Sequence, residues 1–228
     1  MIRAFFLDTT ALCRERAEQI INETPALAGV IGTRSPERRI ESEAGYILLC
    51  CVMRRLGYPE LPRVLRQDGG KPYFEGCPIS FSLSHRPGAA VIAISDEGEV
   101  GADVEWMRDR CRIERVAERA LFGLERIETK NLACELMLCV VNECGEVEFL
   151  EDVAEYENYG LHIKQKSVAD TPYLGWTLLE AALKVGGGGF ADYGQRAKII
   201  SSVAASYYEV SSSGEQYAVT VAARKHTV

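Results

Sequence analysis

The feature that most constrains the fold is an order of elements that occurs twice along the 228 residues. Residues 41–56 carry a helical pattern that ends before Gly57, and short strand-like runs follow it. A second helix is predicted over residues 174–185, where the glycines at 186–189 stop it, and further strand-like runs close the chain. The two halves share little obvious identity, so the pattern predicts a repeated topology rather than a sequence repeat.

Shorter elements are predicted around these two helices. Two further helices are expected, one over residues 11–23 with Thr9 or Thr10 as its N-cap, and one over residues 112–122. The turn Asp-Gly-Gly at 68–70 indicates a hairpin. The runs expected as strands are 2–7, 64–67, 72–74, 80–85, 89–94, 99–105, 198–203, 205–210 and 216–223.

Residues 130–171 interrupt the second half. They contain two strand-like stretches, 135–141 and 145–152, and an acidic and aromatic run at 155–160. This segment is too apolar for a plain linker, so we expect an inserted hairpin. The junction between the two halves is expected near residues 101–108.

Composition narrows the classes of function. The formal net charge is −7, which argues against a general nucleic-acid binder, because neutralising phosphates needs a basic excess. No apolar run approaches the roughly 20 residues that span a bilayer, and the N-terminus lacks the long apolar core of a signal peptide. The eight cysteines form no CxxC pair, so we expect free thiols and a cytoplasmic location.

Paired carboxylates mark a candidate metal site. Asp103 and Glu105 stand two apart on an expected strand, so both side chains leave the same face. Such a pair repels itself unless a cation lies between, and oxygen ligands favour Mg²⁺ over zinc. A solvated acidic strand end is the alternative. On the second helix Glu180 and Lys184 lie one turn apart, a spacing that is also typical of a weak surface ion pair.

A second candidate site lies where a strand meets a loop. Ser84, His85 and Arg86 offer a hydroxyl, an imidazole and a guanidinium, a set that suits phosphate binding. An ordinary loop histidine is the alternative. A serine hydrolase is excluded, because adjacent strand residues point apart and the sequence has no GxSxG segment. It has no Walker A motif either.

Four segments form one ordered set of motifs when they are taken together: GKP at 70–72, FSLSH at 81–85, GADVE at 101–105 and W-x-x-x-EA-x-x-K-x-G at 176–186. In this order they closely resemble the 4′-phosphopantetheinyl transferases, and in particular the Sfp-type, pseudo-dimeric branch. The resemblance covers residues 70–125 and 172–190 well, and the strand order elsewhere loosely.

The resemblance implies an activity and a fold. These enzymes move the phosphopantetheine arm of coenzyme A onto a serine of a carrier protein and release adenosine 3′,5′-bisphosphate. Their fold class is α+β, with two pseudo-symmetric lobes that each pack helices on a small, mainly antiparallel sheet and share one active site. For this chain it implies lobes at 1–101 and 102–228, the second with the insertion around 130–171, and a monomer.

Carried over by position, the resemblance implies a magnesium site beside a coenzyme site. The expected Mg²⁺ ligands are Asp103, Glu105 and Glu180. Glu180 is also expected to act as base toward the serine, directly or through a metal-bound water, with Lys184 and His85 as the other catalytic residues. The residues expected to bind coenzyme A are Lys71, Pro72, Ser84, His85, Lys184, Arg38 and Arg39.

The sequence also departs from the family pattern. Leu179 stands where a lysine usually precedes the metal glutamate, which removes one cation, and Ser82 replaces a common asparagine. The family usually has an arginine on a helix of the first lobe that faces the 3′-phosphate of the coenzyme. In this sequence the nearest equivalent position is Tyr46. One of three arginines, Arg34, Arg38 or Arg39, is expected to substitute for that family arginine. The insertion precedes the catalytic helix, where it could alter carrier docking.

The leading hypothesis is therefore an active transferase of the holo-[acyl-carrier-protein] synthase type. The alternative is a non-catalytic paralogue that binds a carrier protein or coenzyme A. Leu179 and Tyr46 favour this alternative, whereas the three retained carboxylates argue against it. An unrelated Mg²⁺ phosphohydrolase would leave the GKP and SH segments unexplained.

The expected partner is an acidic acyl or peptidyl carrier protein of fatty-acid, polyketide or non-ribosomal peptide synthesis; no nucleic acid and no membrane is expected. Because the whole chain is acidic, docking would need a local basic patch. The arginines expected to form it are Arg108, Arg110, Arg112, Arg115 and Arg119. An ordinary charged helix, balanced by Glu114 and Glu118, is the alternative.

Overall fold

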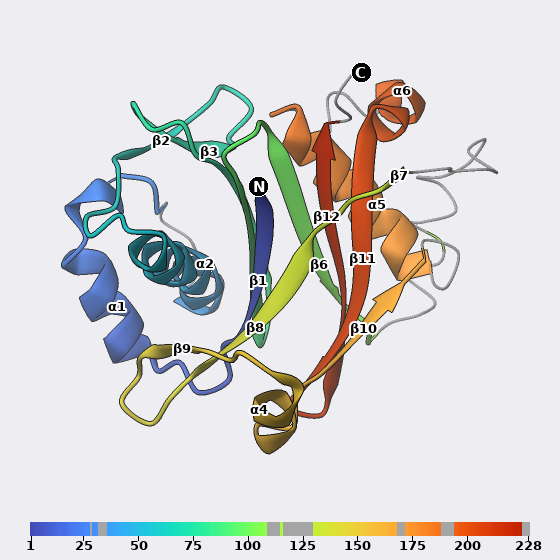
Figure 1. Cartoon of the computed structure of the whole chain (residues 1–228). Helices are drawn as coiled ribbons and strands as arrows, with labels where there is room; N and C mark the ends of the chain where they lie inside the picture. Colours follow the sequence, from blue (N-terminus) through green and yellow to red (C-terminus); the bar gives the residue numbers. More distant parts are fainter. Residues whose placement is uncertain are drawn as a thin grey trace.

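Two β-sheets packed face to face form the centre of the molecule, and helices cover the outer face of each sheet (Figure 1). This computed structural model describes residues 1–27, 29–31, 36–108, 115, 130–167, 172–187 and 194–224, without the side chains of 36–38 and 172. The fold is α+β with mainly antiparallel sheets, as expected from the sequence.

The first sheet has the strand order β4-β5-β1-β8-β9. Its strands are β1 (Ile2–Asp8), β4 (Ser80–Arg86), β5 (Ala89–Ser95), β8 (Glu135–Val141) and β9 (Val147–Phe149). The helices on its outer face are α1 (Arg14–Asn22) and α2 (Pro36–Arg55), with a short 3-10 turn, η1 (Pro25–Leu27), between them. A small hairpin of β2 (Val64–Arg66) and β3 (Pro72–Phe74) follows α2.

The second sheet has the order β10-β11-β12-β6, with β7 paired to β11. Its strands are β6 (Val100–Trp106), β7 (Lys130–Asn131), β10 (His162–Lys166), β11 (Val203–Ser212) and β12 (Glu215–Arg224). The helix on its outer face is α5 (Pro172–Val185), and two short helices, α4 (Val153–Asn158) and α6 (Arg196–Ser201), complete the described elements.

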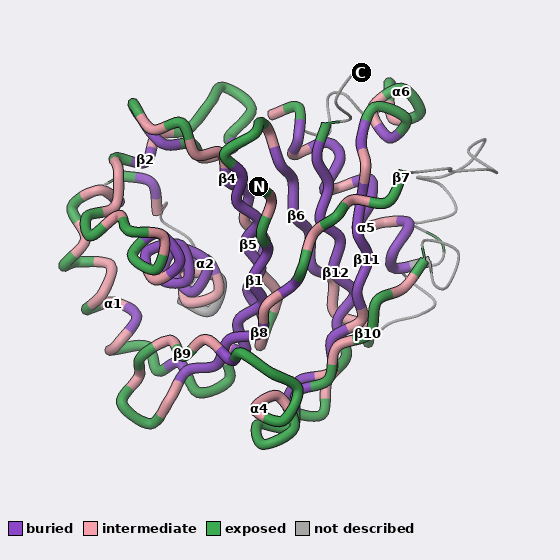
Figure 2. The backbone as a smooth tube through the Cα atoms, in the orientation of Figure 1, coloured by how far each residue is buried: buried purple, intermediate pink, exposed green. Residues whose placement is uncertain are grey.

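Alternation along the strands divides the core into layers. On β1, Phe5 and Leu7 pack toward α2, whereas Ala4 and Phe6 pack toward the second sheet. The same period of two sends Val104 of β6 toward the first sheet. Figure 2 shows the resulting concentration of buried residues on both sheets, on α2 and on α5.

One strand pattern occurs in both halves. In the first half, β5 pairs antiparallel with β4 and with β1; in the second, β12 pairs antiparallel with β11 and with β6. Each half thus places its first strand beside its last one, a pairing that the sequence had not predicted. The division into two lobes at residues 101 and 102 stays a prediction.

The segment 130–171 contacts both sheets. Within it, β8 and β9 form the expected antiparallel hairpin, but β8 extends the first sheet by pairing in parallel with β1. The strands β7 and β10 instead pair with β11 of the second sheet. The acidic and aromatic run forms helix α4, whose N-cap Asp152 accepts a hydrogen bond from the Glu155 amide.

Several local expectations were wrong. Helix α1 begins after Cys13, because Thr10 donates its hydroxyl hydrogen bond to Asp8 instead of capping the helix. Helix α2 begins at Pro36 rather than 41, and proline suits a first helical turn. Residues 198–201, expected as a strand, belong to α6, where Ile200 packs into the core beside α5.

Other expectations fall partly outside the described residues. The helix expected at 112–122 is one of them, with only position 115 described there. The described cysteines form no disulfide, as expected. Among the described residues, no helix is long and apolar enough to cross a membrane.

Candidate active site

The candidate site is a pocket of about 410 Å³ where the edge strands β4 and β6 meet, between α2 and α5. The β2–β3 hairpin contributes to its wall. Most of the residues predicted from the sequence line it: Lys71, Pro72, Ser84, His85, Asp103, Glu180 and Lys184. Four separate segments of the chain therefore meet at one place.

Asp103 on β6 is the most buried carboxylate of the pocket, with 2% of its surface exposed. Its Oδ1 accepts hydrogen bonds from Ser84 Oγ at 2.8 Å and from Lys184 Nζ at 2.7 Å. Its Oδ2 is buried without a hydrogen-bond partner among the described residues. Such an oxygen has lost water without compensation, so it favours a cation or donor from a ligand.

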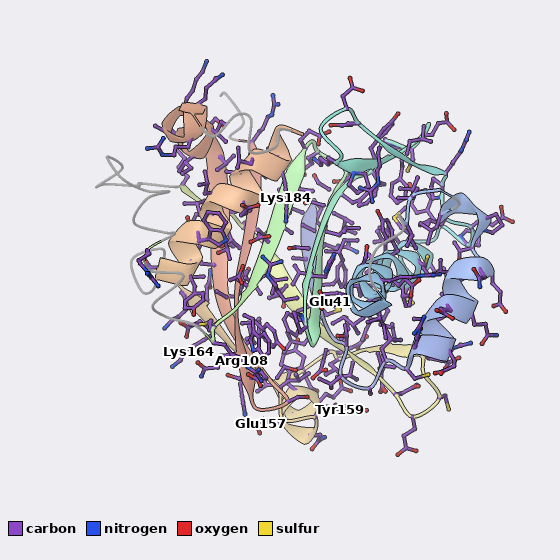
Figure 3. The ribbon with its side chains drawn as sticks, turned by 180° about the vertical axis from the view of Figure 1, so that it is seen from behind. Glu41, Arg108, Glu157, Tyr159, Lys164 and Lys184 are labelled. Atoms are coloured by element: carbon purple, nitrogen blue, oxygen red, sulfur yellow. The ribbon has the colours of Figure 1, made fainter. Side chains whose placement is uncertain are left out.

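Glu180 and Lys184 lie one turn apart on α5 and both line the pocket. Lys184 also donates to the carbonyl of Ala102 at 2.9 Å, and Figure 3 shows it beside β6. Glu180 Oε1 is buried without a hydrogen-bond partner among the described residues. Burial, and next the charge of Asp103, raise the pKa of Glu180 to about 7, which suits a proton acceptor near neutral pH.

A tight approach of backbones brings α5 to β6. A Cβ atom on Gly101 would overlap the carbonyl oxygen of Ala181, so only glycine fits there. A second close approach joins the hairpin to the end of α5, because a Cβ on Gly69 would overlap the carbonyl of Gly187. The glycines after α5 therefore do more than stop the helix, which is all that the sequence predicted of them.

Glu105 leaves the same face of β6 as Asp103 but pairs with Arg86 of β4. The Arg86 guanidinium donates from Nη2 to Glu105 Oε2 at 2.7 Å, and from Nε to both oxygens at 3.1 and 3.2 Å. Burial alone would lower the pKa of Arg86, but its hydrogen bonds to Glu105 and the nearby charges of Asp103 and Glu180 raise it. Arg86 thus pairs with Glu105 and lines the same pocket as Asp103 and Glu180.

The arrangement fits a magnesium ion in part. Within the part of the chain that the structure describes, no group of three or more His, Cys, Asp or Glu side chains is placed to hold a metal. The partnerless oxygens of Asp103 and Glu180 fit an ion that takes one or two protein carboxylates and fills its shell with water and phosphate. Glu105 as a third ligand stays a prediction, because Arg86 holds it here.

The other predicted coenzyme residues differ in their surroundings. His85 Nδ1 lies 3.5 Å from Glu41 Oε2 of α2. Lys71 is buried, which lowers its pKa; it pairs with Glu99 and donates to the Val100 carbonyl at 3.1 Å. Its charge therefore already has a partner.

Arg34, Arg38 and Arg39, the arginines expected to bind a phosphate, are not among the described side chains that line the pocket. Arg39 pairs with Glu43 at 2.7 Å and does not line the pocket. The side chain of Arg38 and the whole of Arg34 lie outside the described residues.

Arg66 on β2 lines the pocket and was missed in the sequence. It donates to the Val30 carbonyl at 2.8 Å, to the Gly70 carbonyl at 2.7 Å and to the Tyr46 hydroxyl at 3.2 Å. Among the described residues it has no carboxylate partner, so its charge is held in place without being neutralised. The hairpin turn was a signal, because its register pairs Arg66 with Pro72 of the GKP segment.

Leu179 and Tyr46, two of the departures from the family pattern, have clear places. Leu179 is fully buried in the apolar cluster between α5 and the second sheet and does not line the pocket. Tyr46 is buried on α2, lines the pocket and accepts the hydrogen bond from Arg66. The position of Tyr46 thus still contributes to a cationic wall, through its neighbour.

The expected basic patch is only partly described. Arg108 lies over the ring of Trp106, 3.6 Å from its centroid, and pairs with Glu215. Arg115 is exposed. The remaining three, Arg110, Arg112 and Arg119, lie outside the described residues. The patch stays a prediction.

Comparison with known proteins points to one class of transferase. No family model matches the chain. Over 88 residues the chain is 38% identical to the 4′-phosphopantetheinyl transferase AcpT of Salmonella typhimurium, a match that covers 38% of this chain and 43% of that protein. Over 65 residues it is 40% identical to the AcpT of Escherichia coli K12, covering 28% and 33% of the two chains. The chain thus matches less than half the length of these curated relatives.

Proposed function

We propose that the protein is a Mg²⁺-dependent 4′-phosphopantetheinyl transferase of the Sfp-type branch and the holo-[acyl-carrier-protein] synthase type. The observation that carries the proposal is the meeting of Asp103, Glu180 and Lys184 with the GKP and SH segments in one pocket. The similarity to proteins named as 4′-phosphopantetheinyl transferases supports it independently.

The proposed reaction breaks the phosphoanhydride bond in the pyrophosphate of coenzyme A and forms a phosphoester bond to the carrier serine. The hydroxyl oxygen of a carrier serine forms a bond to the β-phosphorus of coenzyme A, and the bond from that phosphorus to adenosine 3′,5′-bisphosphate breaks. Glu180, with its pKa near 7, takes the serine proton directly or through a water. Little covalent chemistry is required of the protein, so positioning and charge stabilisation carry the catalysis.

The remaining residues act on the phosphates and on the ion. Asp103 and Glu180 would hold Mg²⁺, which when bound neutralises charge that develops on the pyrophosphate. Lys184 lies one turn from Glu180 and donates to Asp103. A phosphate is also an anion, so Lys184 would exchange Asp103 for a phosphate of the bound coenzyme. His85 and Arg66 supply donors from the opposite wall.

The partner proposed for this site is an acyl or peptidyl carrier protein, with coenzyme A as co-substrate. A monomeric, cytoplasmic protein remains our expectation. Which of the fatty-acid, polyketide or peptide carriers it modifies is left to experiment.

The second candidate function is binding of coenzyme A or a carrier protein without transfer. The pairing of Glu105 with Arg86 favours it, since it leaves only two carboxylates for the ion. The buried place of Leu179 weakens one of the two sequence features that first suggested it.

Intact mass spectrometry of an apo carrier protein tests the proposal. Incubation with this protein, coenzyme A and Mg²⁺ should add about 340 Da, the phosphopantetheine arm left by transfer at phosphorus. The gain should disappear with EDTA and with Asp103→Ala. If several unrelated apo carriers gain no mass although coenzyme A binds, the binding-only function replaces the proposed one.

A further inference from the structure

Arg86 is the cation that pairs with Glu105, and it lines the pocket together with Asp103 and Glu180. It holds Glu105 by a bidentate pair, with 37% of the Arg86 side chain and 18% of the Glu105 side chain exposed. Its Nη1 donates to the carbonyl of His85 at 3.0 Å, which fixes the guanidinium against the end of β4. Planar two-point pairs of this kind are among the stronger ion pairs in proteins.

Two carboxylate oxygens of the pocket have no cation beside them. Lys184 donates a hydrogen bond to Oδ1 of Asp103, and Arg86 donates to Glu105. The buried oxygens without partners among the described residues are Asp103 Oδ2 and Glu180 Oε1. Glu105, the third predicted ligand, is instead engaged by the guanidinium of Arg86.

The pairing follows from strand geometry. Ser84 and Arg86 leave one face of β4, and Asp103 and Glu105 leave one face of β6, two residues apart in each case. Because the two edge strands lie together, Ser84 contacts Asp103 and Arg86 contacts Glu105. The pairing of Arg86 with Glu105 is therefore set by the two strands and does not depend on a loop.

We propose that Arg86 is a positioning residue that competes with the divalent cation for Glu105. In the metal-free protein Arg86 holds Glu105 away from Asp103 and Glu180, and it releases Glu105 when the cation binds. This proposal rests on the proposed Mg²⁺-dependent function. Its consequence is a weaker metal affinity than three free carboxylates would give, because the Arg86–Glu105 ion pair has to break when the metal binds.

Binding of Mn²⁺ alone, followed by the electron paramagnetic resonance of the free ion, tests the competition without any nucleotide. The Arg86→Gln variant should bind Mn²⁺ at least about fivefold more tightly than the wild type, because no ion pair has to break. A merely structural role would not strengthen metal binding. Circular dichroism checks that the variant is folded.

Two further variants separate competition from charge. In an Glu105→Gln background, Arg86→Gln should lose most of its gain, since there is no carboxylate left to free. Arg66→Gln is the matched control: it removes a guanidinium from the same pocket without freeing a carboxylate, and should change Mn²⁺ affinity by less than about twofold. Unchanged or weaker binding by Arg86→Gln, or an equal gain in the Glu105→Gln background, overturns the proposal.

The carrier-protein assay keeps the two proposals apart. If the wild type transfers the arm but Arg86→Gln gains no Mn²⁺ affinity, the competition is wrong and the proposed function stands. If Arg86→Gln gains affinity through Glu105 while no carrier is modified, the competition stands and the transferase activity fails.

Discussion

The two walls of the pocket come from the helices that cover the two sheets, yet they differ in chemistry. The wall of α5 and β6 carries Asp103, Glu180 and Lys184, whereas the wall of α2 carries Ser42 and Tyr46 beside Arg66 of β2. The first suits a cation and a proton transfer. The second offers hydroxyls and a guanidinium, which suit a phosphate.

The two helices also differ in how closely they approach their sheets. On the α5 side, the absence of a side chain at Gly101 lets the helix backbone come close to β6, the strand that carries Asp103. On the α2 side, a Cβ on Gly45 would lie 3.6 Å from Leu83 Cδ1, an ordinary contact. The two walls thus differ both in their side chains and in how closely the covering helix approaches the sheet beneath it.

The largest expected effect comes from removing the charge of the α5 wall at its centre. Asp103→Asn should lower transfer to the carrier about thousandfold, because it removes a buried anion that Lys184 and the ion both need. Initial rates from carrier mass measure it, with exposed Asp96→Asn as the control. Retention of a tenth of the activity would break the assignment of this wall to the metal.

The close approach at Gly101 gives the next effect. Gly101→Ala should cost about 3 kcal/mol of unfolding free energy, because the added carbon meets backbone that cannot rotate away. Urea titration measures it. The control is Gly194→Ala, where a Cβ would have nothing within 4 Å. A loss below about 1 kcal/mol would mean that α5 can shift, and that the two walls are less different than they look.

Substitution of Arg66, the cation beside α2, tests whether the α2 wall binds a phosphate. Arg66→Gln should weaken coenzyme A binding about tenfold, since a guanidinium held by neutral acceptors keeps its charge for a phosphate. Isothermal titration calorimetry measures it. Arg63→Gln is the matched control, because Arg63 pairs with Glu75 on the exposed side of the same segment. Equal effects of the two variants would remove the phosphate role from this wall.

The last prediction concerns the dependence of stability on pH. Burial, and next the charge of Asp103, raise the pKa of Glu180 from 4.5 to about 7, so the folded protein binds this proton more tightly than the unfolded chain. Without divalent cations, wild-type stability should therefore fall relative to Glu180→Gln as pH rises from about 4.5 to about 7. Above pH 7 the variant should be more stable by on the order of 2 kcal/mol.

Thermal and urea unfolding at several pH values measure this difference. Exposed Glu157→Gln on α4 serves as the control and should follow the wild type at every pH. Parallel curves for Glu180→Gln and the wild type would show that Glu180 meets more water than its place on the α5 wall implies.

The sequence by itself determined the motifs and many of the elements, because both depend on residues close along the chain. Short apolar runs marked β1 and β5, the Asp-Gly-Gly turn marked the β2–β3 hairpin, and the glycines marked the end of α5. The shared face of Asp103 and Glu105 also followed from strand period.

Only the tertiary structure decided which groups face each other, because such contacts join distant segments whose spacing the chain does not encode locally. It paired Arg86 with Glu105, placed Arg66 beside Tyr46, and buried Leu179 away from the pocket. It also joined β8 to β1 across more than a hundred residues. The chemistry of the candidate site depends on these contacts, since the cation that the tertiary structure places beside a carboxylate decides whether its oxygens are engaged or open to a ligand.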